Sequence, residues 1–200
     1  MNLLTQNAKM KKTSIKNNIK ILNFSIPAYK TKSGKVTCPF AAACVKYCYA
    51  QKGNYTRFPI VQELMEKKYL LSKQDNFNTL MNAEIIKKKA THIRIHDSGD
   101  FYSIAYLLKW VDIANANKDI IFYAYTKSIK FFKGVINIPK NLKIIFSEGS
   151  KTDDLINARF DRHARIFKTS EALIKAGYID ASSNDLNAIQ DNKKVGLVYH

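Results

Sequence analysis

The sequence predicts an α/β domain of about five mostly parallel strands with helical crossovers, arranged as an open or partial (β/α) barrel. Short apolar segments typical of strands alternate with longer segments whose apolar residues recur at helical spacing. The chain has 200 residues and 46% hydrophobic content, which is enough for one compact core. A complete eight-stranded barrel typically needs about 250 residues, so an open or partial barrel suits this length better.

The first half of the chain contains the least regular segments. Residues 1–18 are polar and rich in Lys and Asn, and they predict a flexible basic arm before a single α/β domain over 19–200. The first strand is expected from Ile19, where apolar and polar residues alternate until Pro27 stops them. After a cysteine-containing loop, the apolar spacing predicts two helices, over residues 59–73 and 76–89.

The second half alternates strands and helices more regularly. Strands are expected over residues 91–97, 119–127, 142–150 and 193–200. Helices are expected over residues 101–116, 128–135 and 161–177, the last ending at Gly177. Because helical segments separate successive strands, the strands are expected to run parallel.

The charge balance is strongly basic, with 33 Lys and Arg against 16 Asp and Glu and a formal net charge of +17. Such an excess favours phosphate-bearing partners or an acidic protein surface. A lysine-rich composition without any binding role is the alternative. The basic residues are scattered along the chain, which makes a nucleic-acid partner a secondary hypothesis.

The sequence favours a cytosolic location and no membrane partner. No stretch approaches the ~18 consecutive apolar residues that a membrane span needs, and the N-terminus has no hydrophobic run of signal-peptide length. Thiols stay reduced in the cytosol, so a cysteine cluster there points to a metal or to catalysis before it points to disulfides.

The three cysteines, Cys38, Cys44 and Cys48, lie within eleven residues in the pattern C-x5-C-x3-C. Their odd number also argues against a disulfide framework. Thiolates are the preferred ligands of iron–sulfur clusters and of zinc, and short spacing lets them converge on one centre. The first hypothesis is a [4Fe-4S] cluster whose fourth site is open or is filled by a ligand other than cysteine.

Two alternatives remain for the cysteines. A closed zinc site needs four ligands, so zinc would require a histidine from elsewhere in the chain. The candidates are His92, His96, His163 and His200. The second alternative is three buried thiols that hold no metal. For an iron–sulfur cluster, His96 is the candidate fourth ligand.

Polar residues follow three consecutive predicted strands. Ligands bind at the carboxyl ends of strands in parallel α/β folds, so these residues predict the rim of a pocket beside the cysteine loop. Asp97 and Asp100 are suited to bind an ammonium group or a ribose hydroxyl; alternatively, Ser98 or Asp100 caps the following helix. The candidate ligand-binding residues are Asp97, Ser98, Gly99, Asp100, Tyr125, Thr126, Lys127, Ser147 and Glu148.

Three segments in order resemble the phage gene-product-88 family. They are SIPAYKTKSGKVTCPFAAACVKYCYAQKGNY at 25–55, RIHDSGDFYS at 94–103 followed by Trp110, and FYAYTKS at 122–128. The resemblance covers roughly residues 25 to 130, and a weaker similarity is present in the C-terminal sequence GLVYH. It implies a phage origin, a location in the cytoplasm of the infected host cell, and an iron–sulfur domain similar to radical S-adenosylmethionine (SAM) proteins. Longer relatives carry a second cysteine-rich segment near the C-terminus, which this chain lacks.

The radical-SAM superfamily places C-x3-C-x2-C after its first strand, with an aromatic residue before the last cysteine. This chain also has Tyr47 before Cys48, and HDSGDF lies where that superfamily has a glycine-rich, cofactor-binding segment. The cysteine spacing differs. The resemblance implies SAM or another small molecule as ligand, with redox or radical chemistry, and leaves enzymatic activity open.

Two non-catalytic functions compete with this interpretation. The first is an iron–sulfur protein that serves electron transfer, sensing or structure. The second is a basic nucleic-acid-binding protein of phage replication or host takeover, with a structural metal centre.

Overall fold

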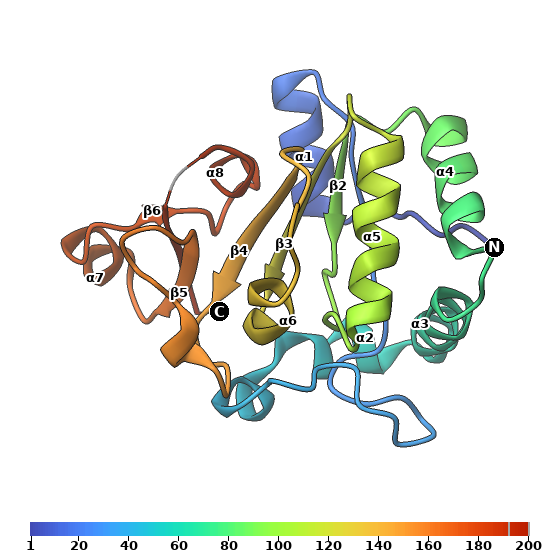
Figure 1. Cartoon of the computed structure of the whole chain (residues 1–200). Coiled ribbons are helices and arrows are strands. Elements are labelled where there is room, and N and C mark those ends of the chain that lie inside the picture. Colours follow the sequence, from blue (N-terminus) through green and yellow to red (C-terminus); the bar gives the residue numbers. More distant parts are fainter. Residues whose placement is uncertain (192, 200) are drawn as a thin grey trace.

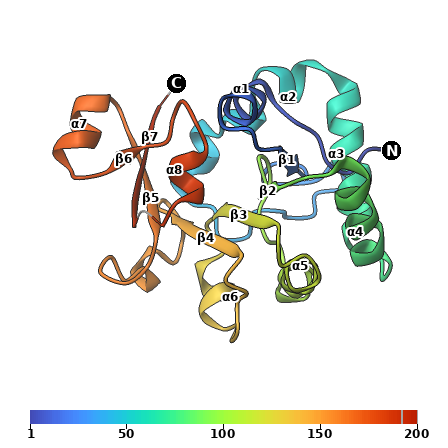
Figure 2. The same cartoon turned by 90° about the horizontal axis from the view of Figure 1, so that it is seen from above.

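The computed structural model describes residues 1–191 and 193–199 (Figure 1). Within these residues, seven parallel strands form one sheet in the order β1-β2-β3-β4-β5-β7-β6. The sheet is curled and open, a half-barrel, which confirms the predicted fold class (Figure 2). The strands are β1 Ile21–Phe24, β2 His92–Ile95, β3 Ile121–Thr126, β4 Leu142–Ser147, β5 His163–Phe167, β6 Ile179–Asp180 and β7 Lys194–Val198.

Helices cover both faces of the sheet. Figure 2 shows α5 and α6 on one face and α1 and α8 on the other. The α-helices are α1 Ala8–Asn17, α2 Asn54–Arg57, α3 Pro59–Ser72, α4 Phe77–Lys88, α5 Ile104–Ala116, α6 Ile129–Lys133, α7 Ser170–Lys175 and α8 Leu186–Ile189. Three short 3-10 helices complete the described elements: η1 Ala43–Tyr47, η2 Tyr49–Gln51 and η3 Asp153–Leu155.

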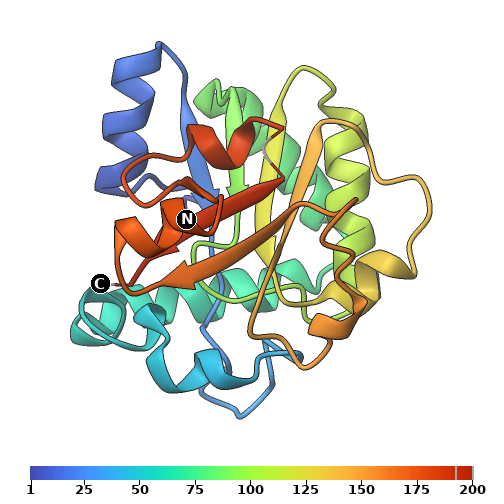
Figure 3. The same cartoon turned by 90° about the vertical axis from the view of Figure 1, so that its left-hand side faces the viewer.

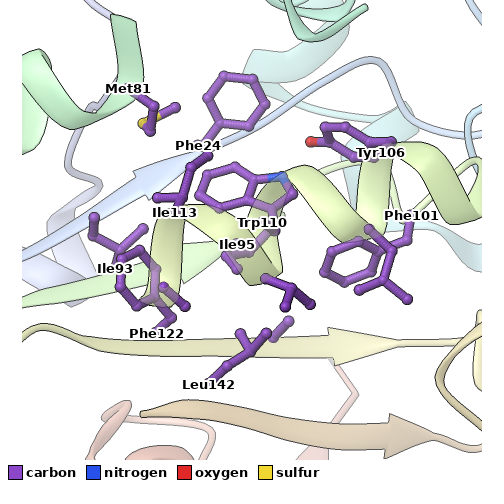
Figure 4. Packing of buried hydrophobic residues seen from close by; sticks show 14 of the residues in the cluster. Phe24, Met81, Ile93, Ile95, Phe101, Tyr106, Trp110, Ile113, Phe122 and Leu142 are labelled. Atoms are coloured by element: carbon purple, nitrogen blue, oxygen red, sulfur yellow. The ribbon is translucent and has the colours of Figure 1, made fainter. Parts of the chain in front are cut away.

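The larger core lies between the sheet and helices α4, α5 and α6, and aromatic rings dominate it (Figure 4). Trp110 of α5 is fully buried, and its ring meets those of Phe24 and Phe77 edge to face at centroid distances of 5.5 and 5.7 Å. Such pairs stabilise a core beyond the area that they bury. A smaller core on the other face joins α1 and α8 to the inner side of the strands.

The N-terminal segment corrects the expectation of a flexible arm over residues 1–18. Residues 8–17 form helix α1, capped by Asn7, whose side chain accepts a hydrogen bond from the backbone of Met10. Leu4 and Met10 are fully buried. Only a few apolar residues of this segment meet the core, and several of its polar side chains bond to distant parts of the chain, so its sequence has the composition of a loose arm.

The segment 161–177 is a second correction, because the structure divides the predicted helix into strand β5 and the short helix α7. β5 pairs with β4 and β7, and Thr169 caps α7 by accepting a hydrogen bond from the backbone of Ala172. Pairing with strands on both sides overrides the helical pattern of the local sequence. The five predicted strands are confirmed, and β5 and β6 are additional. The expected end of the last strand at His200 lies outside the described residues.

Candidate metal centre at the carboxyl end of the sheet

The cysteine loop, residues 37–55, lies across the carboxyl ends of the strands, at the bottom of Figure 1. It is docked on the segment that follows β4. The backbone N–H of Ala42 donates to the carbonyl of Gly149 (3.2 Å), and that of Lys151 donates to the carbonyl of Phe40 (2.8 Å). Cys44 lies in η1 and Cys48 joins η1 to η2, so both thiols are carried by short helical turns at this edge.

All three cysteines are free thiols and partly buried. The backbone N–H of Tyr29 donates to the Cys38 sulfur at 3.3 Å. Burial, followed by the nearby Asp100 carboxylate, raises the pKa of Cys38 to about 12, and burial also raises the pKa of Cys44. The Cys48 thiol interacts electrostatically with both of the others. The Cys38 and Cys44 thiols are therefore protonated at neutral pH.

The histidines named as further ligands contact other groups. Nδ1 of His92 lies 2.8 Å from the Thr91 hydroxyl, and Nε2 of His163 lies 3.0 Å from the Tyr178 hydroxyl. His200 lies outside the described residues. Across residues 1–191 and 193–199, no group of three or more His, Cys, Asp or Glu side chains is close enough to hold one metal ion.

His96 lies in the core, where it contacts α5. Its Nε2 is 2.9 Å from the Tyr106 hydroxyl, and its ring packs edge to face on Phe101 at 4.7 Å. Burial lowers the pKa of His96 to about 3, so the imidazole is neutral. Its contacts among the described residues are with core aromatic side chains, and none of them joins it to a cysteine.

Asp100 connects the loop after β2 to the end of β3. Its carboxylate accepts from the Thr126 hydroxyl (2.6 Å) and from the backbone N–H groups of Phe101 (2.7 Å) and Lys127 (2.8 Å). Burial raises the pKa of Asp100, and these hydrogen bonds oppose the rise. Helix α5 is instead capped by Ser103, which accepts from the backbone of Tyr106, so neither Ser98 nor Asp100 is its cap.

Gly99 allows a sharp turn in a crowded place. Its φ of +83° is in the region that favours glycine, and an added Cβ would lie 2.3 Å from a side-chain carbon of the buried Ile26. Gly99→Ala is expected to lower the free energy of unfolding by about 2–4 kcal/mol, measured by urea denaturation. Gly34→Ala is the matched control, because Gly34 has a φ of +80° with nothing within 4 Å. Equal losses in the two variants would contradict the role of the Ile26 contact.

Lys127 places a cation beside the cysteine loop. Its Nζ donates to the Ser147 hydroxyl (2.8 Å) and to the carbonyl of Glu148 (2.7 Å), and its charge opposes the rise in the pKa of Cys44. The Glu148 side chain instead contacts Arg165 and Tyr178. Lys127 therefore lies beside the cysteine loop and bonds to Ser147, whereas the Glu148 carboxylate belongs to another cluster.

Sequence reasoning missed a buried charge network on the inner face of the sheet. Arg94 of β2 lies 3.5 Å from Asp97, 3.6 Å from Asp185 and over the ring of Tyr125 at 5.5 Å. Asp185 also pairs with Lys9 at 3.0 Å. In the sequence, Arg94 is recognisable as a charged residue between two isoleucines in a short predicted strand. No local sequence pattern distinguishes Asp185 or Lys9 as members of the network.

Asp97 is held within this network by groups from three segments. Its carboxylate accepts from the Tyr55 hydroxyl (2.7 Å) and the Asn7 side-chain amide (3.1 Å), while its backbone carbonyl accepts from the Tyr49 hydroxyl. The Tyr49 ring is exposed, but its hydroxyl reaches inward. Asp97 therefore ties the cysteine loop to the N-terminal segment and to β2.

No helix among the described residues has the length and apolar character that crossing a membrane requires.

Fold and site together define a parallel α/β half-barrel with a three-cysteine loop over the carboxyl ends of its strands. The chain belongs to the Gene product 88 family, whose model matches residues 1–199. It is 36% identical over 102 residues to the Gene 88 protein of Mycobacterium phage L5, covering 46% of this chain and 43% of that protein. It is 35% identical over 102 residues to the Gene 88 protein of Mycobacterium phage D29, covering 46% and 42%.

The aligned segment thus spans less than half the length of these two curated relatives. No solved structure matches the chain. The family membership and the phage relatives confirm the gene-product-88 resemblance.

Proposed function

We propose that this phage protein binds a [4Fe-4S] cluster through Cys38, Cys44 and Cys48 in the cytoplasm of the infected host cell. The observation that carries the proposal is the position of three free thiols in one short loop at the carboxyl ends of parallel strands. Ligands bind at this edge in parallel α/β folds. The N–H···S hydrogen bond from Tyr29 adds support, since such bonds tune the potentials of iron–sulfur clusters.

The number of thiols favours a cluster over a single zinc ion. A closed zinc site needs four ligands, whereas a cluster held by three cysteines leaves one iron open to another ligand. The chain has three cysteines, and the Cys48 thiol interacts electrostatically with both of the others.

The fourth coordination site is proposed to be open to a small ligand, with SAM as the candidate that the radical-SAM-like sequence pattern provides. When bound, a cluster of this kind supplies one-electron redox or radical chemistry. The residues suited to hold a ligand beside it are Lys127, which supplies a positive charge, and Ser98. The Ser98 hydroxyl is buried and has no hydrogen-bond partner within the described part of the chain.

Electron paramagnetic resonance of the reduced, anaerobically prepared protein tests the open site. Adding SAM is expected to change the cluster spectrum, because a ligand on the free iron alters its electronic environment. The matched control is S-adenosylhomocysteine, which lacks the methyl group and the sulfonium charge. A spectrum that SAM leaves unchanged would exclude SAM as the ligand and leave a cluster for electron transfer, sensing or structure.

A second candidate function rests on the net charge of +17. A basic nucleic-acid-binding protein of phage replication or host takeover would use the cluster as a structural centre. Its affinity for DNA or RNA should fall steeply with salt, because phosphate contacts release counterions. Titration of a labelled duplex at several salt concentrations measures this, and an affinity insensitive to salt would contradict phosphate contacts.

A further inference from the structure

We propose a second site on the outer face of the sheet, where Arg165, Lys194 and Tyr178 bind a phosphate monoester of a small molecule. The site is an open cleft of about 470 Å³. It lies among β5, β7 and α7, the elements turned toward the viewer in Figure 3. Its lining residues are Glu148, Asp153, Ile156, Ala158, His163, Arg165, Ala176, Tyr178 and Lys194. None of them is a cysteine-loop residue.

The strand register brings the polar groups of this cleft together. His163 of β5 pairs with Lys194 of β7, and Arg165 lies two residues farther along the same face of β5. Tyr178, just after α7, contacts both cations, with Arg165 at 5.5 Å and Lys194 at 5.8 Å from its ring centroid. The cleft therefore has one buried aromatic ring that contacts two positive charges.

The acidic groups of the cleft are held by internal donors. Glu148 accepts from Nε of Arg165 at 2.6 Å with one oxygen and from the Tyr178 hydroxyl at 3.2 Å with the other. Asp153 accepts from the backbone N–H groups of Gly149 (2.7 Å) and Ser150 (2.9 Å). These hydrogen bonds fix both carboxylates, so the acids hold the site in shape.

The donors of the cleft that remain for a ligand are on Lys194 and Arg165. Lys194 is exposed and makes no ion pair with any residue in 1–191 or 193–199. Arg165 uses Nε for Glu148, and its side chain is 50% exposed, which leaves its two terminal amino groups for a ligand. An ammonium and the edge of a guanidinium next to the same ring are suited to an anion with several oxygens.

The size and lining of the cleft favour a phosphorylated small molecule over a free ion. A volume of about 470 Å³ is in the range of sites that hold small organic ligands. Ile156, Ala158 and Ala176 supply apolar surface beside the charged groups. A sugar phosphate would place its dianion between Arg165 and Lys194 and its carbon skeleton against these side chains.

Isothermal titration calorimetry of the full chain with ribose 5-phosphate, in phosphate-free buffer at fixed ionic strength, tests the proposal. Lys194→Gln is expected to weaken binding about tenfold, because a charge-assisted hydrogen bond is lost. The matched control is Lys118→Gln, which removes the same charge from an exposed loop before β3. This control should bind like the unaltered protein, and ribose without phosphate should not bind.

Two results would overturn the site. The first is the absence of measurable ribose 5-phosphate binding to the unaltered protein. The second is an equal loss of affinity in Lys194→Gln and Lys118→Gln, which would assign the binding to diffuse positive charge. Both variants change exposed lysines without an ion pair, so their folding is expected to be unaffected. The affinity for ribose 5-phosphate is expected to be independent of the iron content of the protein, so this test is separate from the tests of the cluster.

Discussion

Replacing Cys38, Cys44 or Cys48 individually by alanine is expected to abolish cluster binding. A [4Fe-4S] cluster with three protein thiolates brings about four iron atoms per chain, and two thiolates do not retain it stably. Because metal binding and folding are coupled, each variant should also melt at the temperature of the metal-free protein. Iron analysis and thermal denaturation of anaerobically reconstituted protein measure the two effects.

The matched control for the cysteine variants is Lys46→Ala, which changes an exposed residue in the same loop. This variant should keep the iron content and melting temperature of the unaltered protein. If all three cysteine variants kept their iron, these thiols would not be the ligands. Loss of iron in Lys46→Ala as well would indicate that the assay reports loop integrity and not ligation.

Replacing Arg94 by glutamine is expected to lower the free energy of unfolding by about 3–5 kcal/mol. Arg94, whose side chain is 12% exposed, lies near the buried Asp97 and Asp185, so its removal leaves two carboxylates in the interior without their shared cation. Burial alone would raise the pKa of Asp185, but Arg94 and Lys9 hold this pKa below its usual value of 3.8. Urea denaturation at neutral pH measures the loss.

The pH dependence gives this prediction a second test. Asp185 has a lowered pKa in the folded state, so its contribution to stability is present above about pH 4 and is lost as the pH falls through the folded pKa. The difference between the unaltered protein and Arg94→Gln should therefore shrink in acid. Lys143→Gln is the control, because Lys143 pairs with the exposed Asp191 and should cost little. A similarly small loss in Arg94→Gln would contradict the network.

The sequence predicted those elements whose pattern is local. Residues 59–73 and 101–116 carry apolar residues at helical spacing, and the structure has α3 and α5 there. The strand expected over 119–127 is β3, Ile121–Thr126, as its β-branched and aromatic composition indicates. The placement of Asp100, Thr126 and Lys127 at one edge followed from the parallel order of the strands.

The sequence could not predict features that depend on distant partners. β5 is a strand because β4 and β7 flank it, although its residues continue into a helical pattern. Asp185 pairs with Arg94 although almost half the chain separates them in sequence, and no local spacing links them. His96 follows a strand like its polar neighbours, yet its backbone has a φ of +67° and its ring contacts Tyr106 of α5.

Quantitation of iron and acid-labile sulfide tests the cluster most directly. The protein is prepared without oxygen from cells with ample iron, and its folding is checked by circular dichroism. We predict a brown protein with about four iron and four sulfide per chain. A folded, colourless preparation that contains neither would contradict the assignment of the three thiols as cluster ligands.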